Sequence, residues 1–491
     1  MAGTSGFFIQ NNGVVNLKDI PRLEMPEFRG SILREAASGA RIVSLFGSPG
    51  LGGRVDIYAV MAHDKSGRLY LSVTSVKDGY ESITPDCPQA QLFEREIFEE
   101  YGVIPRGHPW LKPVRKNTAG AGTREFWRVP DGRCHEVAVG PVHAGIIEPG
   151  HFRFQCLGED VLHLEAELGY QHRGIERALC VSPSAKIISY METAAGDTSI
   201  GHSMAYCRAV ESLSGCHIPA RAQCLRGIAL ELERLANHSG DLGALSGDIA
   251  YLPTASYCGR LRGDFLNMTA LLCGSRFGRS LLCPGGINFD MDSKLVFQLR
   301  EKLEAAFADL KNAAALLWNT PSVLDRFEGT GRLSQEQCLS LGLVGPACRA
   351  CGIERDVRFD FPYGIYRFEQ IPVATYPSGD VFARAYVRWL ESERSVDFIR
   401  SQLESMPDGV TIQKPGGLAV ESMTVSLVEG WRGEICHVAV SRADGGIARY
   451  KITDPSFHNW LGLSVAMRGE QISDFPLCNK SFNLSYCGHD L

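Results

Sequence analysis

The spacing of apolar residues changes along this chain of 491 residues, and that change limits the folds open to it. Residues 40–78 hold short apolar runs separated by turns, which is the pattern of strands and hairpins. Residues 89–101 have the 3.6-residue period of an amphipathic helix, which we expect to stop at Gly102. A small, polar, Gly-rich tract at residues 116–135 is typical of a linker. The first part of the chain is therefore predicted to be an α/β unit of its own.

The pattern beyond the tract is different. A second strand-like segment covers residues 134–167, and apolar stripes with helical spacing follow at residues 225–235, 293–318 and 381–405. Residues 419–452 return to strand-like alternation. These patterns indicate a mainly helical domain with small sheets at its periphery.

We therefore predict an α+β chain with two domains. An N-terminal α/β docking domain, residues 1–118, and a linker, residues 119–134, precede a mainly helical domain with small peripheral β-sheets, residues 135–491.

Composition excludes several classes of partner. The net charge of −6 argues against nucleic acid or an anionic membrane surface as the main partner. No apolar run approaches the roughly 20 residues that cross a bilayer, and the N-terminal residues lack the basic and apolar regions of an export signal. The 16 cysteines are accordingly expected to be reduced thiols in the cytoplasm.

Cys348 and Cys351 form the only CxxC pair. One such pair supplies half of a tetrahedral zinc or iron–sulfur site, so two buried thiols in a turn are the favoured interpretation. The Gly-rich segment 47–53 lacks the Gly-Lys-Ser/Thr ending of a phosphate-binding loop and is interpreted as a hairpin turn. No dinucleotide-binding fingerprint is present, so any NADH would be bound by another protein.

A specific motif lies at the end of the first domain. Glu94-Arg95-Glu96, a helix end, and then Gly107-His108-Pro109 with Leu111 resemble the signature of the 30-kDa-type subunit of respiratory complex I. The resemblance implies docking, with an acidic helix and an irregular arm packed against neighbouring subunits. A catalytic His108 is the weaker alternative, because no nucleophile or second acid/base lies near it in the sequence.

The rest of the chain resembles the large subunit that group 4 [NiFe] hydrogenases share with complex I, where it is the 49-kDa-type subunit. The fused order of the two parts is also that of formate hydrogenlyase-type complexes. The matching segments are Gly140 to His143, Glu148 to Arg153, Tyr170 to Glu176, Glu231 to Leu235 with His238, Gly274 to Gly278, Pro284 to Gly286, Gly345-Pro346, Arg349-Ala350, Gly379-Asp380 with Ala383-Arg384, and Arg432 to Glu434.

The chain departs from the hydrogenase pattern at the metal ligands. A hydrogenase of this family has two CxxC pairs, whereas the matching positions here hold Ala195 and Thr198, then Ser485 and Gly488, with Cys487 one residue off. Nickel and iron in such a site need soft thiolate ligands. The resemblance therefore implies that the Ni–Fe centre is absent and that no residue of this chain is a metal ligand.

Complex I uses the corresponding cavity for a quinone headgroup. The resemblance places His151 at the position of its hairpin histidine and Asp248 at that of the aspartate behind it, so these two are the candidate catalytic residues and a local proton donor. The family tyrosine is replaced by Gly196, which can neither hydrogen-bond a carbonyl oxygen nor release a proton. A core histidine closing a hairpin and a helix-capping aspartate are the structural alternatives.

Three further residues are expected to line the same cavity and contact a cofactor: His143, His202 and Arg432. Their structural alternatives are histidines that bind turn carbonyls and an arginine in a buried ion pair left over from the metal site.

The resemblance as a whole implies a peripheral-arm subunit of a membrane-bound redox complex, without a self-contained active site. It would shape a quinone-like or proton-coupling cavity, with quinone as the possible cofactor. Its expected partners are a small iron–sulfur subunit, which would carry the clusters, and antiporter-like membrane subunits. The chain would lie at the cytoplasmic face of the cell membrane, held there by these partners. A hydrogenase subunit with atypical ligands and a catalytically inert assembly scaffold are the alternatives.

Overall fold

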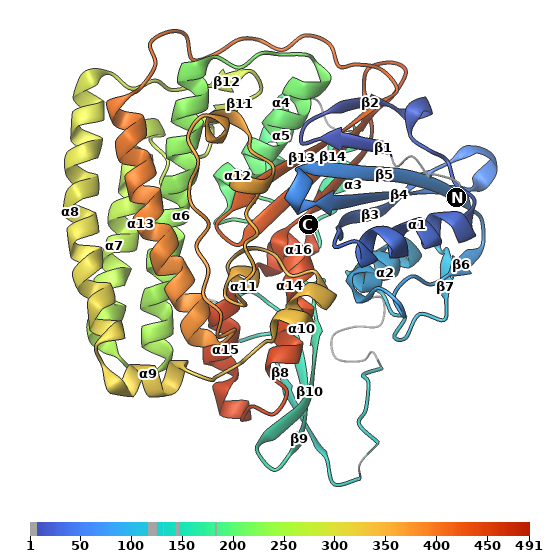
Figure 1. Cartoon of the computed structure of the whole chain (residues 1–491), viewed down its shortest axis with the longest axis horizontal. Coiled ribbons are helices and arrows are strands. Elements are labelled where there is room, and N and C mark those ends of the chain that lie inside the picture. Colours follow the sequence, from blue (N-terminus) through green and yellow to red (C-terminus); the bar gives the residue numbers. More distant parts are fainter. Residues whose placement is uncertain (1–6, 116–124, 131, 144–146, 182–183) are drawn as a thin grey trace.

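The computed structural model describes residues 7–115, 125–130, 132–143, 147–181 and 184–491. The architecture is α+β, as predicted. Figure 1 shows a β-rich N-terminal part on one side, a group of long helices on the other, and strands β13 and β14 between them.

The N-terminal part is an antiparallel sheet of order β1-β5-β4-β3 covered by helices α1 and α2. Its core includes Phe28 of α1, Leu45 of β3, and Phe93 and Ile97 of α2. Helix α2 ends as expected, because Gly102 takes the left-handed conformation at φ 71° that closes a helix. The elements are β1 (Phe7–Gln10), α1 (Met25–Ala37), β3 (Arg41–Pro49), β4 (Val55–His63), β5 (Arg68–Val76), β6 (Gly79–Glu81), α2 (Gln91–Tyr101) and β7 (Ile104–Arg106).

A second sheet joins the two ends of the chain. Its order is β15-β14-β13-β2, so the short strand β2 (Val14–Asn16) pairs antiparallel with β13 (Ser422–Gly430). Strands β13 and β14 (Gly433–Ser441) are buried along their whole length, and β15 (Ile447–Thr453) forms the other edge. The predicted first domain thus contributes an edge strand to the predicted second one. The linker prediction falls partly on residues 119–124 and 131, which lie outside the described part.

The helical part is built on α5 (Ser199–Leu213), α6 (Ala220–Asp248), α7 (Leu252–Cys273), α8 (Ser293–Trp318) and α13 (Val381–Glu404). Helix α6 lies in the middle of these helices and is buried over most of its length. The remaining helices and short strands are α3 (Ile175–Val181), α4 (Ser184–Met191), β11 (Leu282–Cys283), β12 (Gly286–Ile287), α9 (Pro321–Phe327), α10 (Gln335–Leu341), α11 (Gly345–Arg349) and α12 (Val357–Asp360).

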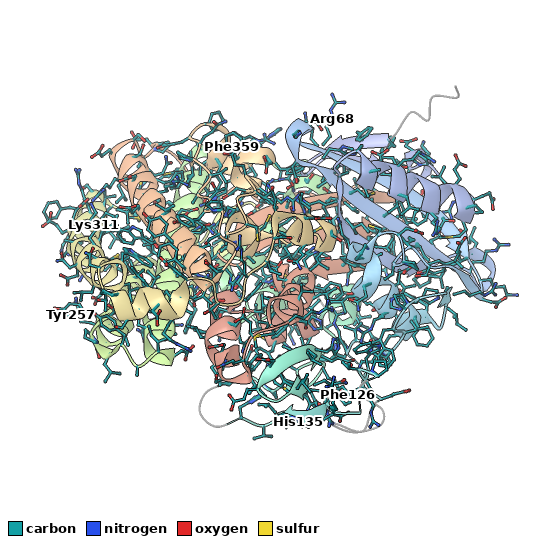
Figure 2. All side chains as sticks on the ribbon, turned by 60° about the horizontal axis from the view of Figure 1, so that its bottom comes forward. Arg68, Phe126, His135, Tyr257, Lys311 and Phe359 are labelled. Carbon is teal, nitrogen blue, oxygen red and sulfur yellow. The ribbon has the colours of Figure 1, made fainter. Side chains whose placement is uncertain are left out.

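A three-stranded sheet of order β10-β9-β8 forms one edge of the molecule. It consists of β8 (His135–Val139), β9 (His151–Leu157) and β10 (Asp160–Glu167), and it packs on the C-terminal helices α14 (Pro455–Ala466), α15 (Phe475–Phe482) and α16 (Tyr486–Asp490). Figure 2 brings this edge forward, with Phe126 and His135 on it. Within the described ranges, no helix is both long and apolar enough to cross a membrane.

Candidate functional site

The two segments that match the metal-ligand positions of hydrogenases lie side by side. Residues 195–198 precede α5, and residues 485–488 open α16. Nη2 of Arg173 donates to the carbonyl oxygens of Ala194 and Cys487, at 3.0 and 3.1 Å, and so joins the two segments. The backbone of Gly196 also hydrogen-bonds the Cys487 thiol. The two segments that the family resemblance singled out therefore lie together at one site in the fold.

An ion pair lies at this place. The guanidinium of Arg432 holds both carboxylate oxygens of Asp197, at 2.6 and 2.7 Å, and lies 3.9 Å above the ring of Trp431. Burial opposes ionisation of Asp197, but the charge of Arg432 outweighs it and holds the pKa of Asp197 below its usual value. The guanidinium of Arg432, a predicted cofactor contact, thus forms an ion pair with Asp197 of the same chain.

The residues at the four ligand positions do not fit a Ni–Fe centre. The Ser485 hydroxyl accepts a hydrogen bond from the Gly488 N–H at 2.9 Å and so caps α16. A Cβ added to Gly488 would lie 2.6 Å from Oδ2 of Asp454, so a cysteine there would displace this carboxylate. Within the described residues, no three His, Cys, Asp or Glu side chains are grouped so that they could hold a metal ion.

A buried hydrogen-bonded chain begins at the same carboxylate. Oδ2 of Asp454 lies 3.1 Å from Nε2 of His202, whose Nδ1 lies 3.0 Å from Nε2 of His437. Nδ1 of His437 then lies 2.9 Å from the hydroxyl of Tyr450. Although burial alone would raise the pKa of Asp454, the hydrogen bond from His202 lowers it, and burial keeps the pKa of His437 well below its usual value. His202 therefore lies deep in the protein and contacts the site through Asp454.

Glu233 is a site residue that sequence reasoning missed. Its carboxylate accepts hydrogen bonds from the N–H groups of Ile200 and Gly201, at 2.7 and 3.1 Å, in the first turn of α5. Burial, with a smaller contribution from the Asp197 charge, raises the pKa of Glu233 to about 8. The carboxyl thus titrates near pH 8, at the start of α5 and next to the segment that precedes this helix. Its motif, Glu231 to Leu235, was the available signal, but it was used only for family assignment.

His143 and His151 close the loop between β8 and β9. Nε2 of His143 lies 2.9 Å from the carbonyl oxygen of Gly150, and Nδ1 of His151 lies 3.2 Å from that of Gly140. Residues 144–146 of this loop lie outside the described part. Nε2 of His151 is buried and has no hydrogen-bond partner among the described residues. Both histidines have a structural role in this loop, and the nitrogen of His151 that faces no partner among the described residues is a buried one.

Glu148 brings this loop to the site. Its carboxylate accepts a hydrogen bond from the Tyr486 N–H at 3.0 Å and also contacts the Cys487 thiol. Burial raises the pKa of Cys487 to about 11, so the thiol stays protonated at neutral pH. Sequence reasoning did not select Glu148 as a site residue, although it lies in the matching segment.

Asp248 lies apart from His151 in hydrogen-bonding terms. It is the last residue of α6, its side chain is exposed, and the charged group that acts on it is Lys480 of α15. No hydrogen bond or ion pair between described residues joins it to His151. The pairing of these two residues as a proton donor stays a prediction.

Comparison with known proteins shows the family of this chain. Residues 248–424 match the family described as "Respiratory-chain NADH dehydrogenase, 49 Kd subunit", and residues 39–118 match "Respiratory-chain NADH dehydrogenase, 30 Kd subunit". The chain is 33% identical over 353 residues to the carbon monoxide-induced hydrogenase of Rhodospirillum rubrum, covering 71% of this chain and 97% of that protein. The chain belongs to the complex I 49-kDa and group 4 hydrogenase large-subunit family.

Two further relatives resemble this chain, one over most of its sequence and one in its fold. Formate hydrogenlyase subunit 5 of Escherichia coli K12 is 29% identical over 465 residues, covering 89% of this chain and 82% of that protein, so its similarity extends into the fused N-terminal part. A chain from the structure of the membrane-bound sulfane sulfur reductase, described as an archaeal respiratory membrane complex, superposes with a TM-score of 0.69 at 25% identity. That match covers 74% of this chain and 100% of the other.

The 30-kDa-type signature docks onto this chain's own 49-kDa-type part. Glu96 binds Nζ of Lys451 on β15 at 2.6 and 2.7 Å, whereas Arg95 donates within the 30-kDa-type part, to the carbonyl oxygens of Lys112 and Pro113 at 2.7 and 3.0 Å. His108 only bridges backbone groups, the carbonyl oxygen of Gln91 and the N–H of Trp110. Glu96 thus joins two parts of one polypeptide, docking against neighbouring subunits stays a prediction, and the contacts of His108 are structural.

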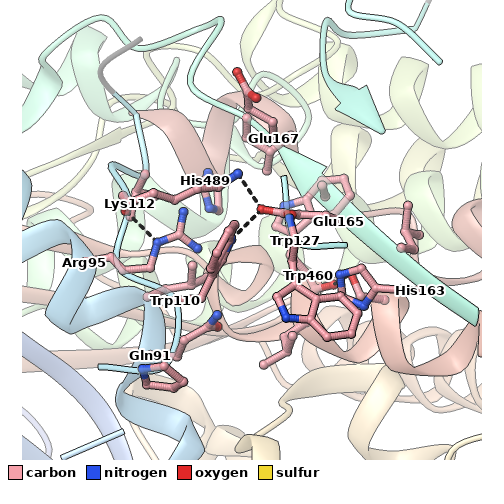
Figure 3. Close-up of a pocket in the computed structure, with 18 of the residues that line it drawn as sticks. Gln91, Arg95, Trp110, Lys112, Trp127, His163, Glu165, Glu167, Trp460 and His489 are labelled. Carbon is pink, nitrogen blue, oxygen red and sulfur yellow. Dashed lines mark hydrogen bonds and ion pairs between the residues drawn. The ribbon is translucent and has the colours of Figure 1, made fainter. Parts of the chain in front are cut away.

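A cavity of about 330 Å³ opens between the two parts (Figure 3). Three tryptophans, Trp110, Trp127 and Trp460, contribute to its wall, and Lys112 is ion-paired with Glu165 there. Because this carboxylate also accepts a hydrogen bond from Nε1 of Trp110 at 2.9 Å, its charge is satisfied within the protein. The cavity is a feature of the docking surface between the two parts.

Proposed function

We propose that this chain is the peripheral-arm subunit of a membrane-bound, complex I-like redox complex. In it the chain links an iron–sulfur subunit to an ion-translocating membrane arm and takes up and releases protons where its hydrogenase relatives have metal ligands. Family membership and the fused order shared with formate hydrogenlyase subunit 5 support the first part. The site geometry supports the second.

Glu233 carries the proton-handling proposal. A buried carboxyl that titrates near pH 8 changes its charge under physiological conditions, whereas the strongly paired Asp197 does not. When Glu233 loses its proton, its negative charge repels that of Asp197, which Arg432 holds, and Arg234 offsets only part of this repulsion. Glu233 protonation and this ion pair are therefore energetically coupled.

Arg432 connects that coupling to the polypeptide. It lies at the turn between β13 and β14, and its Nε donates to the carbonyl oxygen of Asn483 between α15 and α16. A change in the Asp197–Arg432 pair thus acts on the C-terminal segment that also contacts Glu148. This route is a physical means by which a redox change at a partner could alter the conformation of the subunit.

The quinone part of the proposal rests on His151. Its Nδ1 donates to the carbonyl oxygen of Gly140, so in the neutral ring the buried, unpartnered Nε2 is an acceptor, suited to the hydroxyl group that a reduced quinone headgroup presents. Gly196 offers no hydroxyl, but it has open space around the position of a Cβ. When bound, a quinone would supply two-electron, two-proton chemistry. His151 would hold its oxygen, and the tyrosine role would be left unfilled.

The test uses the assembled complex in sealed membrane vesicles. Glu233→Gln is expected to slow reductant-driven charge translocation at least tenfold and to remove the ionisation near pH 8 from the pH–rate profile. Glu301→Gln, an exposed substitution on α8, is the matched control and is expected to leave both unchanged. Normal rates with an unchanged pH profile in Glu233→Gln would favour an inert scaffold, and stoichiometric nickel in the complex would favour a hydrogenase with atypical ligands.

A further inference from the structure

A second cavity, of about 410 Å³, lies further along α5. Its walls come from α5, the start of α6, the 3₁₀ turn Gly364–Arg367, and Asn12 in the turn between β1 and β2. The volume is within the range of small-molecule sites, about 300–1,000 Å³. None of its lining residues belongs to the ion pair, the carboxyl of Glu233 or the histidine chain described above.

Arg208 forms part of this cavity wall, and no carboxylate of the described residues is ion-paired with it. Nη2 of Arg208 donates to the side-chain oxygen of Asn12, whose amide donates in return to the Arg208 carbonyl oxygen at 2.8 Å. The guanidinium lies 4.7 Å above the ring of Tyr363. Nε of Arg208 is buried and has no hydrogen-bond partner among the residues that the structure describes. The contacts of Arg208 are therefore neutral ones.

The nearest carboxylate is already used. Glu211, one turn along α5, binds Arg226 through both of its oxygens and accepts a further hydrogen bond from the Gly285 N–H at 2.8 Å. Arg226 also donates to the carbonyl oxygen of Gly286 at 3.0 Å. The Glu211–Arg226 pair is satisfied on its own, so the charge of Arg208 is left over, and Arg367 adds a second cation to the cavity wall.

A leftover cation of this kind is unfavourable. Burial lowers the pKa of Arg208 to about 10, which still leaves the guanidinium charged at neutral pH. A buried charge without a counter-ion costs free energy that a bound anion would offset. Guanidinium groups bind carboxylate and phosphate oxygens through two parallel hydrogen bonds, and both anions suit the free nitrogens of Arg208.

We propose that this cavity is a binding site for a small organic anion whose carboxylate or phosphate group is held by Arg208. The ligand's apolar body would lie against Met204, Ile218 and Ile365, which line the same cavity. The site is separate from the proposed proton-handling site and does not depend on it.

The test measures anion binding to the full-length chain by calorimetry and by thermal unfolding. The probes are benzoate, phenyl phosphate and inorganic phosphate, with benzamide as the uncharged analogue and sodium chloride at matched ionic strength. Benzoate or phenyl phosphate is expected to bind and raise the unfolding temperature, and benzamide is not. Binding of phenyl phosphate alone would assign the site to phosphate ligands. Binding of inorganic phosphate as tightly as phenyl phosphate would contradict a site for an organic ligand.

Two variants decide whether Arg208 is responsible. Arg208→Gln is expected to weaken anion binding at least tenfold, while Arg262→Gln, a half-buried arginine on α7, leaves it unchanged. Asn12→Asp places a carboxylate on Arg208 itself, at the loss of the amide's hydrogen bond to the Arg208 carbonyl oxygen, so it is expected to abolish the anion response. Anion binding by Arg208→Gln and Asn12→Asp that equals that of wild type would overturn the proposal. So would the absence of binding of any anion by wild type.

Discussion

Nζ of Lys451 lies 2.6 and 2.7 Å from the two carboxylate oxygens of Glu96, although the two residues come from opposite ends of the chain. Arg115 binds the same carboxylate, and all three side chains are buried. Burial alone would raise the pKa of Glu96, but the two cations lower it to about 2. This carboxylate and the buried Arg41–Glu434 pair both hold the 30-kDa-type part against the 49-kDa-type part.

Glu96→Gln is therefore expected to destabilise the protein by about 3–5 kcal/mol, because it leaves the buried Arg115 without its ion-paired carboxylate and Lys451 with Glu176 alone. The pKa of Glu96 is lower in the folded state than in the unfolded state. Its stabilising contribution is hence complete above about pH 5 and is lost as pH falls toward 2. Urea unfolding between pH 3 and 7 measures both effects. Glu301→Gln is the control, and an equal loss of stability in that variant would contradict this assignment.

The stability contribution of Glu233 is expected to depend on pH in the opposite sense to that of Glu96, and Glu233→Gln tests this. The pKa of Glu233 is raised to about 8 in the folded protein, so ionisation opposes folding as pH rises from about 4.5 to 8. Wild type should lose stability relative to Glu233→Gln over this range, by up to about 5 kcal/mol. Unfolding free energies at pH 5, 7 and 9 test it. A constant difference between the two proteins would show that Glu233 does not titrate there.

Asp197→Asn is expected to cost about 1–2 kcal/mol of stability. The buried Arg432 loses a charged partner, but Asp197 is 33% exposed, so solvent already weakens the pair. If Glu233 and Asp197 are coupled, removing the Asp197 charge also lowers the pKa of Glu233. NMR titration of the Glu233 carboxyl in both proteins measures that shift, and an unchanged pKa would remove the coupling from the proposed function.

Two glycines at the former ligand segments should differ sharply in their tolerance of a side chain. Gly196→Ala is expected to change stability by less than about 0.5 kcal/mol, because a Cβ there meets no atom within 4 Å. Gly488→Ala is expected to cost about 1–3 kcal/mol, because its Cβ would lie 2.6 Å from the Asp454 carboxylate. Thermal unfolding compares the two. Similar effects would mean that Asp454 moves freely.

Gly196→Tyr extends the comparison to function. The open space at Gly196 is expected to admit the tyrosine with little loss of stability, adding the hydroxyl that the resemblance to complex I implies at this position. If His151 holds a quinone oxygen, this variant should bind a short-chain quinone analogue at least several-fold more tightly than wild type. Gly196→Phe is the matched control without a hydroxyl, and equal affinity in both variants would exclude a role for that hydroxyl.

Regular periodicity predicted the helical part well. The apolar stripe at residues 293–318 became α8 with the same bounds, and residues 381–405 became α13, which ends at Glu404. The pairing of β2 with β13 had no local signal, because β2 has three residues and its partner lies about 400 residues along the chain. The fold class was therefore predictable, and this contact was not.

The site was predictable in place but not in chemistry. Family motifs located the segments around Gly196 and Cys487, which the structure brings together. Glu231 and Glu233 lie two residues apart on α6, yet the pKa of Glu231 is lowered to about 2, because Arg234 and Arg358 outweigh the effect of burial. Glu233 instead faces α5 and has a pKa raised to about 8. That difference depends on which helix face each side chain occupies, and the spacing alone does not give it.

The pairing of β2 with β13 also has a consequence for making the two parts of this chain as separate polypeptides from two genes. If the polypeptide were cut in the predicted linker, the N-terminal product would still have to insert three residues along the free edge of β13. The other product would expose that buried edge until its partner arrived, and an unpaired edge invites association with other strands. Fusion ensures that both pieces are made together at equal numbers, with the edge covered by its own chain.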